Sequence, residues 1–224
     1  MLDRWLARGA VAVIITLQLL LINDFSIGAR WFAPACELVL VVPLTILTLR
    51  AETLSRRAHT ERDWDSAGWY AQFNLILAQG LVGVVSLSNA RSLTLLLRAL
   101  LAGSTHNGRT LLLDALNIWA TNVIVFSLWY WQLDRGGPSL DPRILKEPSE
   151  FIFPRSTLPA GAPRADVPPG YIDYLFLSFT TSTAFSPTDT LPLTARMKLL
   201  MMLEAIISLL TLALVAARAV NILA

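Results

Sequence analysis

Residues 174–189 read YLFLSFTTSTAFSPTD, an apolar stretch that passes into a run of hydroxyl side chains. The apolar part, from Tyr171 to Ala184, is too short to cross the hydrocarbon layer, which takes about twenty helical residues. Residues 185–196 follow with two prolines and no helical pattern, and an almost unbroken apolar stretch then runs over residues 195–223. Irregular backbone at membrane depth is tolerated only where protein or a water-filled cavity satisfies its polar groups. This order therefore predicts a re-entrant, pore-type loop before the last helix.

The composition of the whole chain places that loop in a membrane protein. Of the 224 residues, 54% are hydrophobic and only 15% are charged, whereas a soluble domain carries about a quarter charged residues. The net charge is +2, and the arginines lie mainly between apolar blocks, where they determine topology. We therefore expect an all-α membrane protein, a multi-pass helical bundle of about six membrane segments whose partner is the lipid bilayer rather than nucleic acid.

The upstream apolar blocks predict four further spans, at about residues 8–23, 31–49, 67–88 and 110–131. Residues 91–103 are rich in leucine but short, about 20 Å of helix at 1.5 Å per residue. This segment is either a short, tilted span or a helix at the interface.

Two features mark the end of the span at 110–131 and the residues after it. Trp129, Tyr130 and Trp131 at its end are typical of an interfacial aromatic belt. Residues 134–170 are rich in proline and glycine, which indicates an extramembrane loop.

The arginine distribution predicts the topology. Residues 50–66 form the most basic short connection and belong in the cytoplasm together with Arg4 and Arg8. With six segments both termini are cytoplasmic, and Ser55 and Ser139 lie on opposite sides of the membrane. If residues 91–103 only lie on the surface, the pore-type loop is cytoplasmic instead.

Polar side chains in the second half supply the candidate site. The pore-loop candidates are Thr180, Thr181, Ser182, Thr183, Phe185, Ser186 and Asp189. On the last helix, the spacing of Glu204, Ser208 and Thr211 places these polar residues near one face. On the span at 110–131, Asp114, Asn117 and Thr121 do the same.

Each of these two polar stripes, one on the last helix and one on the span at 110–131, has two interpretations. They line a polar cavity, or they join neighbouring helices and, in the case of Asp114 and Glu204, reach headgroups or a partner arginine.

The segment at 174–189, with Ala195-Arg196, Leu203-Glu204-Ala205 and Leu214 to Arg218, resembles the pore module of bacterial potassium channels. It is also similar to a family of uncharacterised bacterial multi-pass membrane proteins with this C-terminal layout. The resemblance covers roughly residues 110–224, while the first hundred residues match only in hydropathy.

The resemblance divides the chain into N-terminal membrane helices at 1–109 and a two-helix pore-like module at 110–224. The module holds the extramembrane loop 134–170 and the re-entrant segment 171–189. The resemblance further implies a bacterial inner-membrane location, a homo-oligomer that is a tetramer if it is channel-like, and a monovalent cation as the permeant species.

The chain departs from the channel pattern in its filter. Potassium filters use rings of backbone carbonyls, and glycine permits the dihedral angles that these rings need. No glycine lies between Tyr171 and Ala224, and Ala184, Ser186 and Pro187 stand around Phe185. We therefore expect at most a weakly selective cation channel, and the alternative is a non-conducting membrane scaffold or subunit.

Sequence patterns of catalysis and of metal binding are missing from the chain. It has no H-E-x-x-H and no G-x-S-x-G motif, so enzyme activity is not expected. His59 and His106 have no second ligand at helical spacing, and Cys36 is the single cysteine, so neither a metal site nor a cofactor is expected.

Overall fold

The computed structural model describes residues 2–19, 39, 43–47, 49–50, 53–54, 61–101, 108–134, 149–159, 162, 167–183 and 189–223. Its main helices are α1 (Leu2–Leu19), α3 (Glu61–Leu101), α4 (Gly108–Leu133), α6 (Tyr171–Thr183) and α7 (Ala195–Leu223). Two short strands, β1 (Phe151–Ile152) and β2 (Leu191–Pro192), pair antiparallel, and a 3-10 helix covers Pro154–Thr157.

Three helices in the described part of the chain are long and apolar enough to cross a membrane. Their candidate spans are Gly68–Leu101, Arg109–Leu133 and Ala195–Ala217, and Trp5–Leu19 is a shorter apolar helix. The membrane character expected from composition is therefore supported, and the predicted helices at 110–131 and 195–223 agree with α4 and α7. Most of the predicted span at 31–49 lies outside the described residues.

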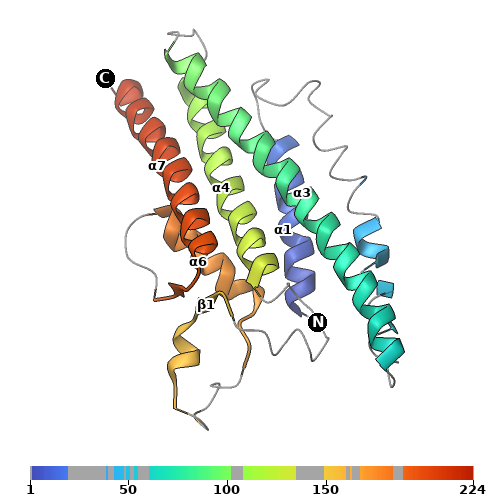
Figure 1. The fold of residues 1–224 in the computed structure, drawn as a ribbon. Helices are drawn as coiled ribbons and strands as arrows, with labels where there is room; N and C mark the ends of the chain where they lie inside the picture. The colour runs from blue at the N-terminus through green and yellow to red at the C-terminus, as the bar shows by residue number, and fades with distance from the viewer. Residues whose placement is uncertain are drawn as a thin grey trace.

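Helix α4 is the centre of the bundle, with α1, α3, α6 and α7 all packed against it (Figure 1). Its candidate span is 61% buried within the protein, against 22% for α3 and 17% for α7. Helix α4 thus most resembles the core helix of a soluble protein. Helices α3 and α7 leave wide apolar faces uncovered.

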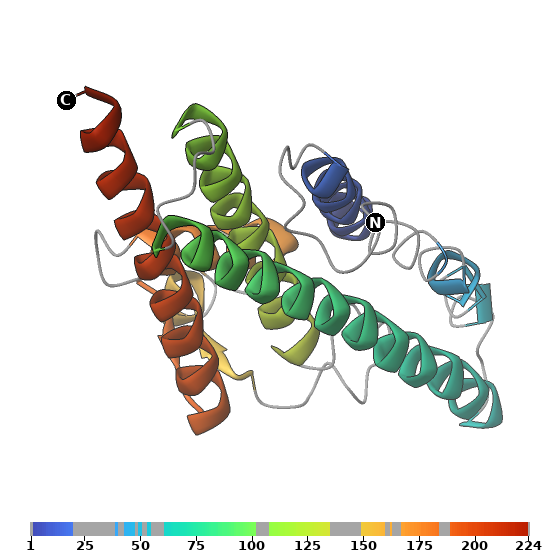
Figure 2. The ribbon, with the colours of Figure 1, turned by 90° about the horizontal axis from the view of Figure 1, so that it is seen from above.

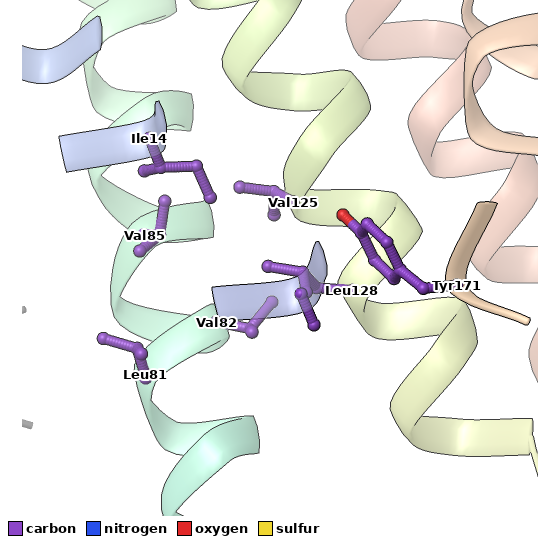
Figure 3. Packing of buried hydrophobic residues seen from close by; sticks show 8 residues of the cluster. Ile14, Leu81, Val82, Val85, Val125, Leu128 and Tyr171 are labelled. Atoms are coloured by element: carbon purple, nitrogen blue, oxygen red, sulfur yellow. The ribbon is translucent and has the colours of Figure 1, made fainter. Parts of the chain in front are cut away.

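One hydrophobic cluster joins α1, α3, α4 and the start of α6. Ile14, Val85 and Val125 point toward one another there, and Tyr171 packs beside Leu128 (Figure 3). Helix α3 contributes one face, on which Val82 and Val85 lie one and four positions after Leu81. The periodic apolar residues therefore decide which faces of the helices meet.

Helix α3 corrects one prediction. Residues 67–88 and 91–103 are not separate segments, because one uninterrupted helix runs over Glu61–Leu101. The intervening Ser88, Asn89 and Ser92 are polar but contain no helix breaker, and all three are buried. Asn89 Nδ2 donates to the Ile118 carbonyl at 3.2 Å, so α4 satisfies part of this polar run.

Because α3 is one helix, residues 67–88 and 91–103 supply one candidate span where two segments were predicted. Asp3 of α1 contacts Tyr171, and Arg196 near the start of α7 contacts the Leu133 carbonyl at the end of α4, so these ends lie together. Helix α7 then runs the length of the bundle away from them, and the two termini lie at opposite ends (Figure 1). Ser55 and Ser139 lie outside the described residues, so the sides of the membrane assigned to them and to the termini stay a prediction.

The structure corrects the predicted aromatic belt at Tyr130. Tyr130 is fully buried, at 0% exposure, within a cluster that includes Phe126, Phe151 and Tyr174. Trp129 is half-buried and donates through Nε1 to Ser86 Oγ at 2.9 Å, and Trp131 packs edge-on to Tyr171. All three rings therefore make contacts between elements of the bundle.

The outward faces of the bundle are strongly apolar. On α3, Trp69 and Phe73 stack with their ring planes 1° apart on an exposed face. On α7, six large apolar side chains are exposed; they are Leu199, Met202, Leu203, Ile206, Leu209 and Leu210. Seen from above, α3 runs obliquely past the other helices (Figure 2).

Candidate functional site

The candidate site is the hairpin made by α6 and the chain that returns to α7. Helix α6 has 13 residues, and it packs against both α4 and α7. After α6, strand β2 pairs with β1, with Phe151 opposite Pro192 and Ile152 opposite Leu191. Because Ser149 and Glu150, just before β1, bond Asp134 at the end of α4, the hairpin begins and returns at the same end of the bundle.

Acidic side chains hold the start of α6. Asp3 Oδ1 accepts a hydrogen bond from the Tyr171 backbone N–H at 3.0 Å, and Asp173 Oδ2 accepts one from Gly170 N–H at 2.7 Å. Asp173 also pairs with Arg155 at 2.8 Å. Carboxylates accept hydrogen bonds from the free N–H groups at a helix start, and the positive end of the helix dipole stabilises their negative charge. Helix α6 is therefore anchored here from α1 and from the preceding loop.

Asp134 fixes the loop to the end of α4. Its buried carboxylate accepts hydrogen bonds from Tyr174 Oη at 2.6 Å, from Glu150 N–H at 2.6 Å and from Ser149 Oγ at 2.9 Å. One side chain of α4 therefore bonds both α6 and the strand that leads into β1.

Glu150 fixes the returning chain. Its carboxylate accepts hydrogen bonds from the Thr194 hydroxyl and from Arg196, and its carbonyl accepts one from Leu193 N–H at 2.9 Å. Partial burial opposes ionisation of Glu150, but the two hydrogen bonds and the Arg196 charge outweigh it and lower the pKa of Glu150 from the usual 4.5. The carboxylate form therefore holds the start of α7 in place.

Within the bundle, Glu204 of α7 is the centre of a polar cluster. It is 0% exposed and lies between α4 and α6. Its carboxyl group contacts the hydroxyls of Tyr130, Ser178 and Ser182, the last at 2.8 Å. The cluster thus joins three helices through a single acidic side chain.

The rest of the predicted polar face of α7 also points into the subunit. Ser208 accepts a hydrogen bond from Asn122 Nδ2 at 2.9 Å, and Thr211 donates to the Ile207 carbonyl of its own helix at 2.8 Å. Glu204, Ser208 and Thr211 are all buried, at 0%, 1% and 0% exposure. They share one face as the spacing predicted, and that face packs against neighbouring helices.

The hydroxyls at the end of α6 bond the backbone of their own helix. Thr180 donates to the Phe176 carbonyl at 2.9 Å and Thr181 to the Leu177 carbonyl at 2.8 Å. Thr183 donates to the Thr180 carbonyl at 3.2 Å. Their oxygens keep free lone pairs on a half-buried surface, so they remain acceptors.

The other pore-loop candidates do not lie together in the structure. Asp189 is exposed just before β2, and Ser182 points inward to Glu204. Phe185 and Ser186 lie outside the described residues. The candidates are therefore close along the chain but do not all face one space.

The stripe on α4 is a helix junction in the structure. Asp114 is buried, at 1% exposure, and so does not reach lipid headgroups. Asn117 Nδ2 donates to the Leu17 carbonyl of α1 at 2.6 Å, and Thr121 Oγ1 lies 3.5 Å from Asn117 Oδ1. The stripe thus connects α4 to α1.

Sequence reasoning missed the partners of the acidic residues. Ser178 and Asn122 are not among the predicted site residues, and Tyr130 was assigned to an aromatic belt. Ser178 and Ser182 are nevertheless four residues apart and so lie on one face of α6. That pair of small hydroxyls was the available signal for a buried polar partner. Asp3 and Asp134 carried no comparable signal.

No group of three or more His, Cys, Asp or Glu side chains that could hold a metal ion occurs among the described residues. Comparison with known proteins adds no relative. A scan against protein-family models, a search of curated proteins and a search of solved structures each return no match.

Proposed function

We propose that this chain is a multi-pass membrane protein whose C-terminal half forms a pore-type module in a homo-oligomer, and that it gives monovalent cations a weakly selective path. The observation that carries the proposal is the hairpin of α6, which enters between α4 and α7 and returns through β2 to the end from which it started. This is the layout of a re-entrant loop between an outer and an inner helix.

The chemistry of the α6 end favours cations over anions. The C-terminal end of a helix carries a partial negative charge, and the hydroxyls of Thr180, Thr181 and Thr183 donate toward their own backbone. Their lone pairs are left to accept from water or to contact a cation. Exposed Asp189 adds a carboxylate close by in the chain, and a ring of such carboxylates concentrates cations at a pore mouth.

Weak selectivity follows from the missing glycines. Hydroxyls and one carboxylate per subunit can contact a partly hydrated cation, but they do not reproduce the stacked carbonyl rings of a potassium filter. One loop supplies only one part of a ring, so the proposal requires several copies, four in the arrangement that the potassium-channel resemblance implies.

A non-conducting scaffold is the second candidate, and one observation favours it. The polar face of α7 packs inside the subunit, while Leu203, Ile206 and Leu210 are exposed on its outer face. An apolar outer face suits contact with lipid or with another membrane protein, and it supplies no polar lining along the helix.

The test is a flux assay on the full chain in liposomes, comparing potassium, sodium and chloride. We expect cation flux to exceed chloride flux, with potassium and sodium similar, and we expect Asp189→Asn to lower cation flux several-fold at low salt, where screening is weakest. Glu61→Gln is the matched control, because it also removes one carboxylate but lies at the start of α3, outside the α6 hairpin. Flux in the control should stay near that of the parent.

The opposite outcomes separate the candidates. Strong potassium preference in the parent would contradict the glycine argument, and unchanged flux in Asp189→Asn would remove Asp189 from the path. A monomer by native mass spectrometry, or no flux of any ion, would leave the scaffold as the function.

A further inference from the structure

The cluster around Glu204 has more hydrogen-bond contacts than hydroxyl protons. Four oxygen–oxygen contacts meet there: Glu204 with Tyr130, with Ser178 and with Ser182, and Ser178 with the Val123 carbonyl at 2.7 Å. Each hydrogen bond needs one proton, and the three hydroxyls supply three. One proton is therefore missing if Glu204 is a carboxylate.

The position of the missing proton follows from the acceptors. A backbone carbonyl only accepts, so Ser178 uses its proton toward Val123. Tyr130 and Ser182 have Glu204 as their hydrogen-bond partner and donate to Oε2 and Oε1 respectively. The contact between Ser178 Oγ and Glu204 Oε1 then has no hydroxyl proton left, and the carboxyl group has to provide it.

The surroundings of Glu204 agree with a neutral carboxyl group. The side chain is 0% exposed, and burying a carboxylate without a cationic partner is very costly, so such groups take up a proton instead. Arg155 pairs with Asp173 and Arg196 pairs with Glu150, and among the described residues no cation is seen paired with Glu204.

Among the described titratable and charged groups of α4, α6, α7 and α3, one contacts Glu204 and several others are directed elsewhere or exposed. Tyr130 of α4 contacts Glu204 directly, while Tyr174 of α6 is directed to Asp134 instead. On α7 itself, Arg196 and Lys198 are exposed near its start. On α3, Arg98 is likewise exposed.

We propose that Glu204 is a proton-binding site, occupied in this structure, at which the bound proton links α7 to Ser178 of α6 and thereby to the Val123 carbonyl of α4. Loss of that proton leaves two oxygen atoms facing each other without a hydrogen between them. It would therefore weaken the contact between α6 and α7. The inference concerns the protein with or without ion conduction, and its test does not use flux.

The test is infrared spectroscopy of the full chain in lipid at neutral pH. A protonated carboxyl group has a carbonyl band separate from the carboxylate bands. We expect this acid band in the parent and its loss in Glu204→Gln. Glu150→Gln is the matched control, because that residue is an ion-paired carboxylate and its replacement should remove carboxylate absorption while leaving the acid band intact.

Asp114 is a further deeply buried acid, on α4, and Asp114→Asn assigns any contribution that it makes to the acid band. An acid band of unchanged size in Glu204→Gln would overturn the proposal, and so would a parent spectrum without that band.

A second variant keeps the proposal testable if Glu204→Gln does not fold. Ser178→Ala removes the acceptor of the Glu204 proton but leaves the carboxyl group in place. The acid band should persist and move to the higher frequency of a more weakly bonded carboxyl group. A band that does not move would show that Ser178 does not receive the proton, and would overturn the proposed link.

Discussion

Asp3 and Tyr171 are 168 positions apart, yet the Asp3 carboxylate accepts the backbone N–H of Tyr171 at 3.0 Å. The first turn of α1 thereby supplies the cap for the start of α6. The candidate hairpin is thus anchored by the N-terminal part of the chain, which shows no resemblance to a pore module beyond hydropathy.

This cap predicts a coupled pair of substitutions. Asp3→Ala should lower the free energy of unfolding by about 1 kcal/mol, the usual loss for a helix cap, while Asp3→Asn should lose less because it keeps an accepting oxygen. Gly170→Ala should also destabilise, since its Cβ would lie 2.6 Å from Asp3 Oδ1. In the double variant Asp3→Ala/Gly170→Ala, the substitution at position 170 should lower the free energy of unfolding only slightly. The reason is that Asp3 Oδ1, the atom that the new Cβ would contact, is absent.

Thermal or denaturant unfolding of the four proteins in one detergent measures this cycle. Additive losses would mean that residue 170 acts independently of Asp3.

The Glu150 cluster predicts loss of stability in acid. Because the pKa of folded Glu150 lies below the usual 4.5, its contribution to folding is complete above the unfolded-state pKa. It is lost as pH falls through the folded-state pKa. Glu150→Gln should therefore be less stable than the parent near neutral pH and should lose less on acidification.

Melting temperatures of both proteins over this acid range are the measurement. The difference in melting temperature between the parent and Glu150→Gln should become smaller as the pH falls. A difference that stays constant would show that the Arg196 and Thr194 contacts are not the source of the stability difference.

The bundle predicts opposite faces for two exposed positions. Thr157 lies in the loop beyond the end of α4, and Leu101 lies at the end of α3, near the start of α4. In a Cys36→Ser background, Thr157→Cys and Leu101→Cys should react with an impermeant thiol reagent from opposite sides of the membrane. Labelling of both from one side would exclude α4 as a single crossing between them.

The buried bond between Asn122 and Ser208 predicts a modest coupling between α4 and α7. Hydrogen bonds between membrane helices contribute about 0.6 kcal/mol on average and up to about 1.7 kcal/mol. Asn122→Ala and Ser208→Ala should each destabilise, and the double variant should lose less than their sum by about this amount. A coupling of zero in the unfolding measurements would mean that the 2.9 Å contact does not stabilise the junction.

Local composition was sufficient to predict α4, α6 and α7. Their ends coincide with prolines, with the loss of apolar residues, or with both, and these signals act within a few residues. The continuity of α3 was not predictable in this way. The polar run at Ser88–Arg91 resembles a break, and what keeps it helical includes the Asn89 bond to α4, a contact between positions 29 apart.

The site shows the same limit. The spacing of Glu204, Ser208 and Thr211 predicted a shared face correctly, but the choice between a cavity and a helix junction depended on partners elsewhere. Tyr130 lies 74 positions from Glu204, and an aromatic residue at a helix end has the same local pattern whether it faces lipid or the core. Only the packing of α4 against α6 and α7 distinguishes the two.

The length of α3 has a consequence for the lipid. Its apolar stretch Gly68–Leu101 has 34 residues, roughly 50 Å at 1.5 Å per residue, while the hydrocarbon layer is about 30 Å thick. Even a tilt of about 40°, the upper end of the usual range, would leave it too long. Such hydrophobic mismatch costs fractions of a kcal/mol per Å, so the protein should be more stable in thick bilayers than in thin ones.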